Sequence, residues 1–196
     1  NVLAMLGKLG KKTAFIGKVG NDQFGNMLRN TIESVGIDAE GLVIDDKVHT
    51  TLAFVHTYPD GDRDFSFYRN PGADMMLRKE EVSLDKICAS KIFHFGTLSF
   101  THAGIRTASQ YAIQCAKEAG ALISFDPNLR EPLWENLEDA RKAIEYGMEC
   151  CDILKISDNE LTFITGEKDY DKGAVLLQQK YQIPLVCVTL GKDGSR

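Results

Sequence analysis

Short runs of apolar residues alternate along the chain with longer stretches in which apolar positions recur every three or four residues. The short runs predict buried strands, and the longer stretches predict amphipathic helices. From residue 91 onward the predicted order is strand, helix, strand, helix, strand, two helices and a strand, over residues 92–95, 104–119, 122–126, 137–148, 153–156, 158–165, 172–181 and 185–190. This alternation predicts an α/β fold whose mostly parallel sheet carries helices on both faces.

The N-terminal part of the chain shows the same two periods. Residues 1–9 have the spacing of a helix, and residues 13–17 form the next predicted strand. Asn21 or Asp22 can then cap a helix that ends at Gly36, because their side-chain oxygens accept hydrogen bonds from the free N–H groups at a helix start. Such a cap accounts for Asp22 without any ligand.

The middle of the chain breaks this alternation. Residues 51–58 and 64–68 are rich in β-forming residues with alternating polarity, and a Pro-Asp-Gly-Asp turn joins them. This pattern predicts a small antiparallel hairpin. Because successive strand residues face opposite sides, Phe67 and Arg69 share one face, whereas Tyr68 lies on the other.

Composition excludes several classes of function. The chain of 196 residues is long enough for one α/β domain, and its net charge of −5 argues against nucleic-acid binding. Its five cysteines lack zinc-like spacing and indicate a reduced, cytoplasmic protein. The four histidines show no metal-ligand spacing, and His94 is expected in or beside the core. No apolar run approaches the roughly 20 residues that a membrane span needs.

Both ends of the sequence are abrupt. The chain begins at Asn1, within a predicted helix, and stops in a loop just after the last predicted strand. We therefore expect it to be a piece of a longer protein.

The most informative stretch reads DPNLR and follows the predicted strand over residues 122–126. It places the carboxylate of Asp126, the amide of Asn128 and the guanidinium of Arg130 just beyond a buried strand. Ligands of open α/β sheets bind outside the carboxyl ends of the strands. A turn whose side chains satisfy only the local backbone is the structural alternative for Asp126 and Asn128. Arg130 favours a site, because a guanidinium is suited to carboxylate or phosphate oxygens.

The first 25 residues combine an Asn at a helix start with a spaced set of glycines, in the sequence NVLAMLGKLGKKTAFIGKVGNDQFG. Chain punctuation explains any one of these glycines. As a set, however, they resemble the first signature of the ribokinase-like (PfkB) sugar kinase family. Leu3 departs from that signature, which usually has a small residue there. The resemblance implies a ribokinase-like three-layer fold with a small β-sheet lid, and it implies that Asn1 binds sugar hydroxyls.

On this resemblance, residues 1–196 form a partial sugar kinase domain whose lid covers about residues 42–70. The segment FYRNPGAD is similar to a segment of fructokinases within the family. The similarity implies that Phe67 packs against an apolar face of the sugar while Arg69 donates hydrogen bonds to its oxygens. Lids also serve as dimer surfaces in some members, so a homodimer through the lid is compatible with this interpretation.

DPNLR closely matches a segment of fructokinases and of 2-keto-3-deoxygluconate kinases. The match implies that Asp126, Asn128 and Arg130 line the crevice where the sugar meets the transferring phosphoryl group. In the family, the strand end that corresponds to Gly96 also faces the sugar.

Two later segments resemble the nucleotide side of the family site. SDNE matches the NxxE motif with Ser157 in place of Asn, which implies that Ser157 lies at the nucleotide phosphates and Glu160 at the hydration shell of Mg²⁺. A helix capping box made by the same two residues is an equally good structural explanation. TLGKDG resembles the TLGxxG segment, so Thr189, Gly191 and Gly194 are expected to contact ATP.

The ordered set of segments implies ATP-dependent phosphoryl transfer to a hydroxyl of fructose, with Mg²⁺ bridging the phosphates. Such transfer requires mainly positioning and charge neutralisation. The family's base is an Asp in a GAGD motif, which this sequence does not contain. We therefore expect no catalytic base within residues 1–196 and no kinase activity from these residues alone.

Two alternatives remain open at this stage. A 2-keto-3-deoxygluconate kinase shares the DPNxR segment, but its lid supplies an aromatic hydroxyl to the substrate carboxylate, and Phe67 has none. A non-catalytic sugar- or nucleotide-binding module is the second alternative, and a GAGD motif in the parent protein would argue against it.

Overall fold

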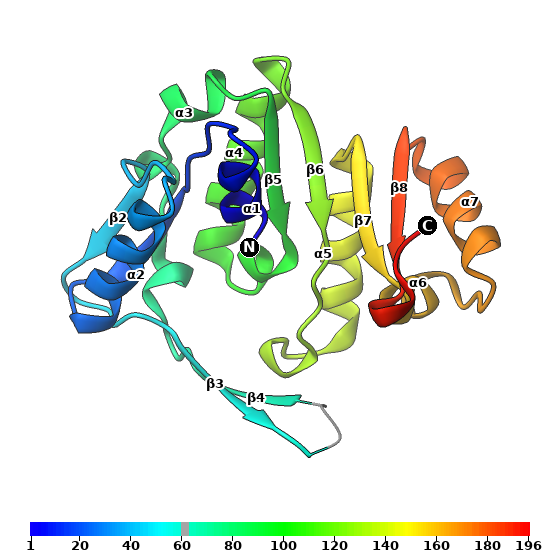
Figure 1. The fold of residues 1–196 in the computed structure, drawn as a ribbon, viewed down its shortest axis with the longest axis horizontal. Helices are drawn as coiled ribbons and strands as arrows, with labels where there is room; N and C mark the ends of the chain where they lie inside the picture. The colour runs from blue at the N-terminus through cyan, green and yellow to red at the C-terminus, as the bar shows by residue number, and fades with distance from the viewer. Residues whose placement is uncertain (60–62) are drawn as a thin grey trace. The chain divides into compact units, whose positions relative to one another are not determined.

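The computed structural model describes residues 1–59 and 63–196, and it divides into two compact units, Asn1–Lys86 and Ile87–Arg196. Figure 1 follows the order of the helices and strands along the chain.

A short parallel pair of strands lies at the centre of the first unit. Strand β1 (Gly17–Gly20) pairs with β2 (Leu42–Asp45) from one end to the other. The buried side chains of this unit include Val19, Ala39 and Leu42, and Ile32 and Ile44 pack against them. Residues 42–45, which the sequence interpretation places at the start of the lid, are therefore paired with β1.

The helices of this unit begin and end close to their predicted bounds. Helix α1 spans Val2–Lys8 with Asn1 at its N-cap, and α2 spans Gln23–Ser34. Asp22 caps α2 by accepting a hydrogen bond from the backbone N–H of Gly25. Gly36 follows α2 with a φ of 78°, in the left-handed region that favours glycine. The capping prediction for Asp22 is confirmed.

The predicted strand over residues 13–17 is wrong. Ala14 makes only an isolated parallel bridge with Asp38, and the regular ladder starts at Gly17. The paired strand contains Lys18, whose charged side chain is buried. A lysine in a strand of four residues hides the apolar signal on which the sequence prediction depends.

The hairpin is confirmed. Strands β3 (Leu52–Thr57) and β4 (Arg63–Tyr68) are antiparallel, with Leu52 opposite Tyr68 and Ala53 opposite Phe67. The predicted turn spans residues 59–62, and residues 60–62 lie outside the described part of the chain. After the hairpin come η1 (Ala73–Met76), η2 (Lys79–Glu81) and α3 (Leu84–Cys88).

The second unit is built on a parallel sheet with the order β5-β6-β7-β8. Its strands are β5 (Ile92–Gly96), β6 (Leu122–Asp126), β7 (Ile153–Ser157) and β8 (Leu185–Thr189). The longer helices are α4 (Ala103–Glu118), α5 (Leu137–Cys150), α6 (Asp158–Thr165) and α7 (Tyr170–Tyr181). Three short 3-10 segments complete it: η3 (Thr97–Phe100), η4 (Glu131–Leu133) and η5 (Gly191–Asp193).

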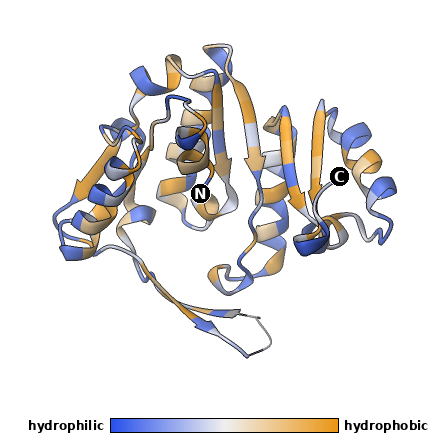
Figure 2. Ribbon diagram, in the orientation of Figure 1, coloured by the Kyte–Doolittle hydropathy of each residue, from blue (hydrophilic) through white to orange (hydrophobic). Residues whose placement is uncertain are grey.

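The buried strand residues of this sheet share one face. They are Phe95, Ile123, Phe125, Leu154, Ile156 and Val188. Helix α5 packs on this face, because Gly147 lies so close to the Phe125 ring that a Cβ there would meet it at 2.3 Å. Figure 2 shows apolar residues running along all the strands of this sheet. The predicted α/β fold with a parallel sheet is confirmed, whereas helices on its other face remain a prediction.

The opposite face of the sheet is more open. Ile92 and Leu122 are 52% and 49% exposed. His94 lies on this face with an exposed side chain, and its Nδ1 is 3.0 Å from the Ser124 hydroxyl. Our expectation that His94 sits in or beside the core is therefore wrong, because strand alternation places Phe93 and Phe95 on the buried side instead. The five cysteines are free.

None of the helices in the described residues is long and apolar enough to cross a membrane.

Candidate functional site

The carboxyl ends of the parallel strands in the second unit gather most of the predicted site residues. Gly96 lies opposite Asp126 in the sheet, and Ser157 lies opposite Thr189. A pocket of about 310 Å³ opens at the ends of β6 and β7. It is lined by Asn128, Leu129, Arg130, Glu131, Lys155, Ser157, Asn159, Glu160 and Phe163.

Asp126 forms an ion pair that the sequence interpretation missed. The Nζ of Lys155 lies 3.1 Å from Oδ2 and 3.2 Å from Oδ1 of Asp126, with the two side chains 40% and 20% exposed. Lys155 and Ser157 are two residues apart on β7 and so share a face of the strand. A lysine two positions before the motif serine was the only signal available in the sequence.

The turn over residues 126–130 is held by residues on both sides of β6. Thr97 is fully buried, and its hydroxyl donates to the carbonyl oxygen of Pro127 at 2.5 Å. The backbone N–H of Leu129 donates to Oε1 of Glu160 at 2.7 Å. Between these two contacts, Asn128 adopts a left-handed φ of 46° and is exposed. The turn thus presents the amide of Asn128 at the edge of the sheet.

Ser157 and Glu160 form the capping box anticipated from the sequence. The Ser157 hydroxyl accepts from the backbone N–H of Glu160, and Oε2 of Glu160 accepts from both the backbone N–H and the hydroxyl of Ser157, at 2.9 and 2.8 Å. Glu160 is only 7% exposed. The capping box is therefore a sufficient structural reason for Ser157 and Glu160. Any role of these residues in ligand binding would be additional to capping.

The pocket is chemically suited to an anion. The Arg130 guanidinium and the Lys155 ammonium line it together with the carboxyl groups of Glu131 and Glu160, and it lies at the N-terminal end of α6. The Glu160 carboxylate is engaged by Leu129 and Ser157, which leaves the two cations to meet an anion. The backbone N–H groups of Ser157, Asn159 and Glu160 are already engaged by protein acceptors, so the dipole of the helix is what favours a phosphate group here. Nη1 of Arg130 is also fixed by donating to the carbonyl oxygen of Leu129 at 2.9 Å. The residues present therefore fit nucleotide phosphates.

A divalent cation fits less directly. Within the described residues, no three His, Cys, Asp or Glu side chains lie together as a metal site. Both carboxylate oxygens of Glu160 already accept hydrogen bonds from protein donors. Mg²⁺ commonly keeps several water ligands and binds through one or two carboxylates together with substrate phosphates, so water and phosphates would have to supply most of its ligands here.

The loop after β8 carries the predicted nucleotide contacts. The Thr189 hydroxyl donates to the carbonyl oxygen of Ile156 at 3.5 Å, so Thr189 is tied to the neighbouring strand. Gly191 and Gly194 have φ values of 58° and 91°, in the region that favours glycine. Both glycines are thus explained by the local backbone, and their contact with ATP remains a prediction.

The predicted sugar-binding residues of the first unit occupy two places. Asn1 caps α1 by position only, because its side chain makes no capping hydrogen bond. The Phe67 ring is stacked on Phe65, with their centroids 6.0 Å apart. The Arg69 guanidinium donates to Oδ2 of Asp74 from Nε at 2.8 Å and from Nη2 at 2.6 Å, and its side chain is only 6% exposed. Arg69 is therefore held within its own segment.

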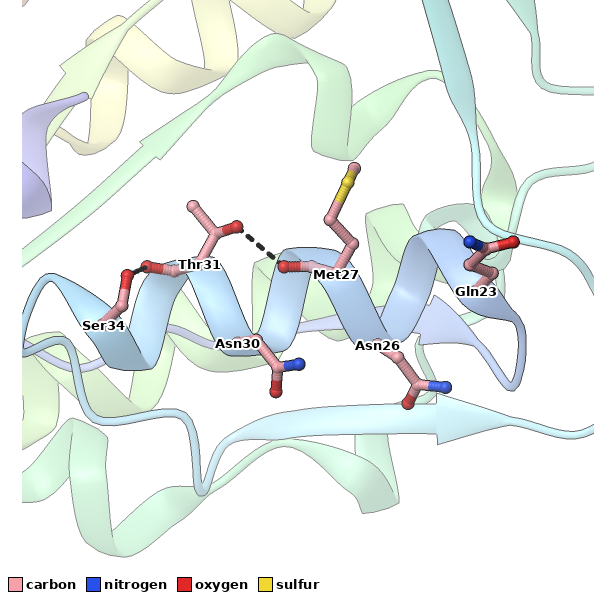
Figure 3. A pocket seen from close by; sticks show the side chains of 6 residues that line it. All are labelled: Gln23, Asn26, Met27, Asn30, Thr31 and Ser34. Atoms are coloured by element: carbon pink, nitrogen blue, oxygen red, sulfur yellow. Dashed lines mark hydrogen bonds between the residues drawn. The ribbon is translucent and has the colours of Figure 1, made fainter.

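A second hollow lies along α2 and offers little chemistry. It is lined by Gln23, Asn26, Met27, Asn30, Thr31 and Ser34, all from this one helix (Figure 3). The hydroxyls of Thr31 and Ser34 donate to backbone carbonyls of the same helix. The lining holds no charged or titratable group that could carry a reaction.

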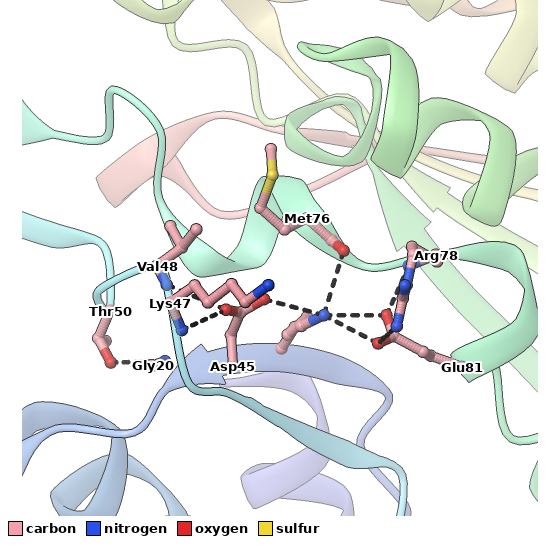
Figure 4. Close-up of polar contacts among 9 residues, drawn as sticks. Gly20, Asp45, Lys47, Val48, Thr50, Met76, Arg78 and Glu81 are labelled. Carbon is pink, nitrogen blue, oxygen red and sulfur yellow. Dashed lines mark hydrogen bonds and ion pairs between the residues drawn. The ribbon is translucent and has the colours of Figure 1, made fainter.

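Figure 4 shows a charged cluster at the end of the first unit's parallel strands, which includes Asp45, Glu81 and Arg78. Lys18 pairs with Asp45 at 3.0 Å and with Glu81 at 2.9 Å, and its side chain is only 5% exposed. It also donates to the carbonyl oxygen of Met76 at 3.3 Å. These contacts fasten the segment after the hairpin to β1 and β2, which is a structural role.

A parallel α/β sheet with a pocket at the carboxyl ends of its strands is the arrangement of a ligand-binding α/β protein. The family model described as "pfkB family carbohydrate kinase" matches residues 1–196. The chain belongs to this family, and the resemblance found in its sequence is confirmed.

Curated relatives of the chain include plant fructokinases. "Probable fructokinase-2" from Arabidopsis thaliana is 45% identical over 196 residues, which cover 100% of this chain and 60% of the relative. "Fructokinase-2" from Solanum lycopersicum is 44% identical over 194 residues, which cover 99% of this chain and 59% of the relative. The chain thus spans about 60% of the length of these relatives.

Solved structures with a similar fold include two bacterial fructokinases. The fructokinase from Xylella fastidiosa has a TM-score of 0.85 and 32% identity, covering 96% of this chain and 58% of that chain. The fructokinase from Vibrio cholerae O395, in a form with bound fructose, ADP and calcium ion, has a TM-score of 0.87 and 30% identity, covering 99% of this chain and 62% of that chain. These likenesses confirm the predicted fold class.

Proposed function

We propose that the whole protein is an ATP-dependent fructokinase that transfers the γ-phosphoryl group of ATP to a hydroxyl of fructose. The observation that carries this proposal is the identity of 45% to a probable fructokinase over the entire chain. The pocket at the ends of β6 and β7 supports it independently, because the cations of Arg130 and Lys155 and the dipole of α6 suit a phosphate group.

The residues of the second unit divide into two roles in this proposal. Arg130 and Lys155 neutralise phosphate oxygens, while Ser157, Thr189, Gly191 and Gly194 line the path of the nucleotide. Phosphoryl transfer depends on such fixed charges, because negative charge spreads over the oxygens of the moving group. Mg²⁺, when bound with ATP, would neutralise further phosphate charge, and it would take its ligands from the phosphates and water, because both carboxylate oxygens of Glu160 already accept hydrogen bonds from the protein.

The sugar contacts proposed for this activity are those that the resemblance to the family implies. Asn1, Phe67 and Arg69 supply the lid and helix-start contacts, and Gly96, Asp126 and Asn128 supply those at the sheet edge. Asp126 acts as a wall of the site, because its carboxylate is engaged by Lys155. The base that receives the hydroxyl proton is the Asp of a GAGD motif, which residues 1–196 do not contain.

The hairpin is proposed to pair with a second copy of the protein. Phe54 and Tyr68 lie on the same face of the hairpin, with their ring centroids 5.4 Å apart, and they are 57% and 69% exposed. A two-stranded hairpin is marginally stable by itself and gains stability when an apolar face is covered. A homodimer in sedimentation experiments that dissociates in the variant Phe54→Lys would support this pairing, and an unchanged mass would contradict it.

The activity is tested by ADP release from the full-length protein with ATP and Mg²⁺. Turnover with fructose that greatly exceeds turnover with 2-keto-3-deoxygluconate is expected, and the reverse order would overturn the choice of sugar. ATP binding without turnover on either sugar would indicate a non-catalytic binding module. A polypeptide of residues 1–196 is expected to show no turnover, and full activity from it would contradict the proposed base.

A further inference from the structure

Two buried side chains hold the turn over residues 126–130 from opposite sides. On one side, Thr97 donates to the carbonyl oxygen of Pro127 from its hydroxyl at 2.5 Å and from its backbone N–H at 3.2 Å. On the other side, Glu160 accepts from the backbone N–H of Leu129 at 2.7 Å. The residues that make these contacts are 0% and 7% exposed. The turn is therefore fixed by long-range contacts and not only by its own sequence.

Asn128 lies between the two fixed points. Its φ of 46° is in the left-handed region, which residues with a Cβ adopt only at some cost in free energy. Asn tolerates this region better than most residues. Even so, the conformation persists only where contacts with the surrounding structure hold the backbone in place. The contacts to Pro127 and Leu129 are on the two residues next to Asn128, so they can hold its backbone in this conformation.

The hydrogen bonds of Glu160 leave its carboxylate little free capacity. Oε1 accepts from Leu129, and Oε2 accepts twice from Ser157, at 2.9 and 2.8 Å. Hydrogen bonds to a charged acceptor are stronger than neutral ones, and burial raises the cost of losing them. Glu160 therefore connects the turn after β6 to the start of α6, which are the two walls of the same pocket.

We propose that Glu160 and Thr97 are positioning residues that hold Asn128 and Arg130 in the geometry required at the sugar and phosphate. In this role Glu160 acts through the backbone of Leu129, and its effect does not depend on a metal ion. The part of this inference that concerns catalysis rests on the proposed function. The part that concerns the turn stands without it, because it can be measured in the protein without substrates.

Hydrogen exchange of the full-length protein tests the inference directly. We expect the Leu129 amide to be protected in the wild type and to exchange roughly 10- to 100-fold faster in Glu160→Ala, since a charge-assisted bond is lost. Glu160→Gln keeps one oxygen that can accept from Leu129, so its effect should be smaller. Asp158→Asn is the matched control, because it removes one negative charge from the same helical turn without contacting Leu129.

Variants of Thr97 distinguish an effect on the position of the turn from an effect on Mg²⁺ binding. Thr97→Val removes the bond from the hydroxyl to Pro127 in a side chain that cannot influence Mg²⁺ directly, whereas Thr97→Ser retains it. We expect Thr97→Val and Glu160→Ala to lower kcat/KM for fructose by roughly 10- to 100-fold, with the Mg²⁺ concentration for half-maximal activity unchanged. Thr97→Ser should stay close to the wild type.

The outcomes are distinct. Exchange of Leu129 that is unprotected in the wild type, or unaltered in Glu160→Ala, would overturn the inference. An increased Mg²⁺ requirement in both Glu160 variants, with normal Thr97→Val, would assign Glu160 to the metal and also overturn it. Faster exchange in a protein that phosphorylates no sugar would support the positioning of the turn while rejecting the proposed function.

Discussion

Lys155 and Asp126 form an ion pair between neighbouring parallel strands, with Nζ 3.1 Å from Oδ2, at the edge of the sheet where the candidate pocket opens. Asp126 comes at the end of β6, and Lys155 lies near the end of β7. The pair explains how a carboxylate can stand beside an anion-suited pocket: a cation of the same sheet face compensates its charge.

This pairing predicts the behaviour of Asp126→Asn in the full-length protein. We expect kcat/KM for fructose to fall roughly 10- to 100-fold, because a charge-assisted hydrogen bond in the site wall is weakened. The acid limb of the pH profile of kcat should be unchanged, since Asp126 is not the base. Steady-state kinetics between pH 5 and pH 9 provide the measurement, and loss of that limb would identify Asp126 as the base instead.

Lys155→Met provides the complementary test of the pair. If Asp126 acts through Lys155, the double variant Asp126→Asn/Lys155→Met should be about as impaired as the more damaged single variant. Additive losses would show that the two side chains act independently.

The buried cluster around Lys18 predicts a large effect on stability. Lys18→Met leaves the carboxylates of Asp45 and Glu81 without the cation that pairs with both. Removing one partner of a buried ion pair typically costs about 3–5 kcal/mol in the free energy of unfolding. Urea unfolding of the full-length protein followed by circular dichroism measures this change.

Arg78→Ala is the matched control for Lys18→Met. Arg78 pairs with the same Glu81 at 2.9 Å, but its side chain is 71% exposed. Exposed ion pairs contribute at most about 1 kcal/mol. Equal losses in the two variants would contradict the idea that burial makes the Lys18 contacts important.

Local sequence signals predicted much of the second unit. Strand β6 covers residues 122–126 as predicted, because a bounded apolar run followed by Asp-Pro leaves few alternatives. Helix α6 spans 158–165 as predicted, since its start is marked by the capping box of Ser157 and Glu160. Where the signal lies within a few neighbouring residues, the sequence determines the element.

Contacts between residues that are distant in the sequence could not be predicted from such local signals. Strand β1 was misplaced because a buried Lys18 looks like a surface residue until Asp45 and Glu81 are known to surround it. Thr97 and Lys155 were missed for the same reason, since their partners Pro127 and Asp126 lie about 30 positions away. The DPNLR turn was identified as a site, but what holds its shape could not be predicted from the turn itself.

Asp22 predicts a dependence of stability on pH. Hydrogen bonds from the backbone of Thr50 and of Gly25 lower the pKa of its carboxyl from 3.8 to about 2. A lowered folded-state pKa means that the stabilisation is complete above the unfolded value and is lost as the pH falls through the folded value. Asp22→Asn should therefore differ most from the wild type above about pH 4, and the difference should shrink toward pH 2.

Thermal unfolding of the full-length protein at pH 6 and at pH 2.5 checks this dependence. Asp46→Asn is a suitable control, because Asp46 accepts one exposed hydrogen bond from Asn21 and touches none of the Asp22 partners. A difference between Asp22→Asn and the wild type that stays constant over this range would exclude the carboxylate as its source.

We expect a side chain at position 96 to disturb the predicted sugar site by steric conflict. A Cβ at this position would lie 2.7 Å from the carbonyl oxygen of Asp126, which is closer than real Cβ atoms come to other atoms. Gly96→Ala should therefore push the end of β6 away from β5 and displace the turn that carries Asn128. We expect KM for fructose to rise by about 10-fold or more, because a small misplacement of a binding group is costly.

Gly166→Ala separates this effect from general strain. Gly166 has a φ of 72° and no atom within 4 Å of an added Cβ, so alanine there should cost about 1 kcal/mol of stability without altering the turn. Kinetics with fructose and thermal unfolding are measured on both variants. A normal KM in Gly96→Ala would show that the sugar does not depend on the close approach of β5 to Asp126.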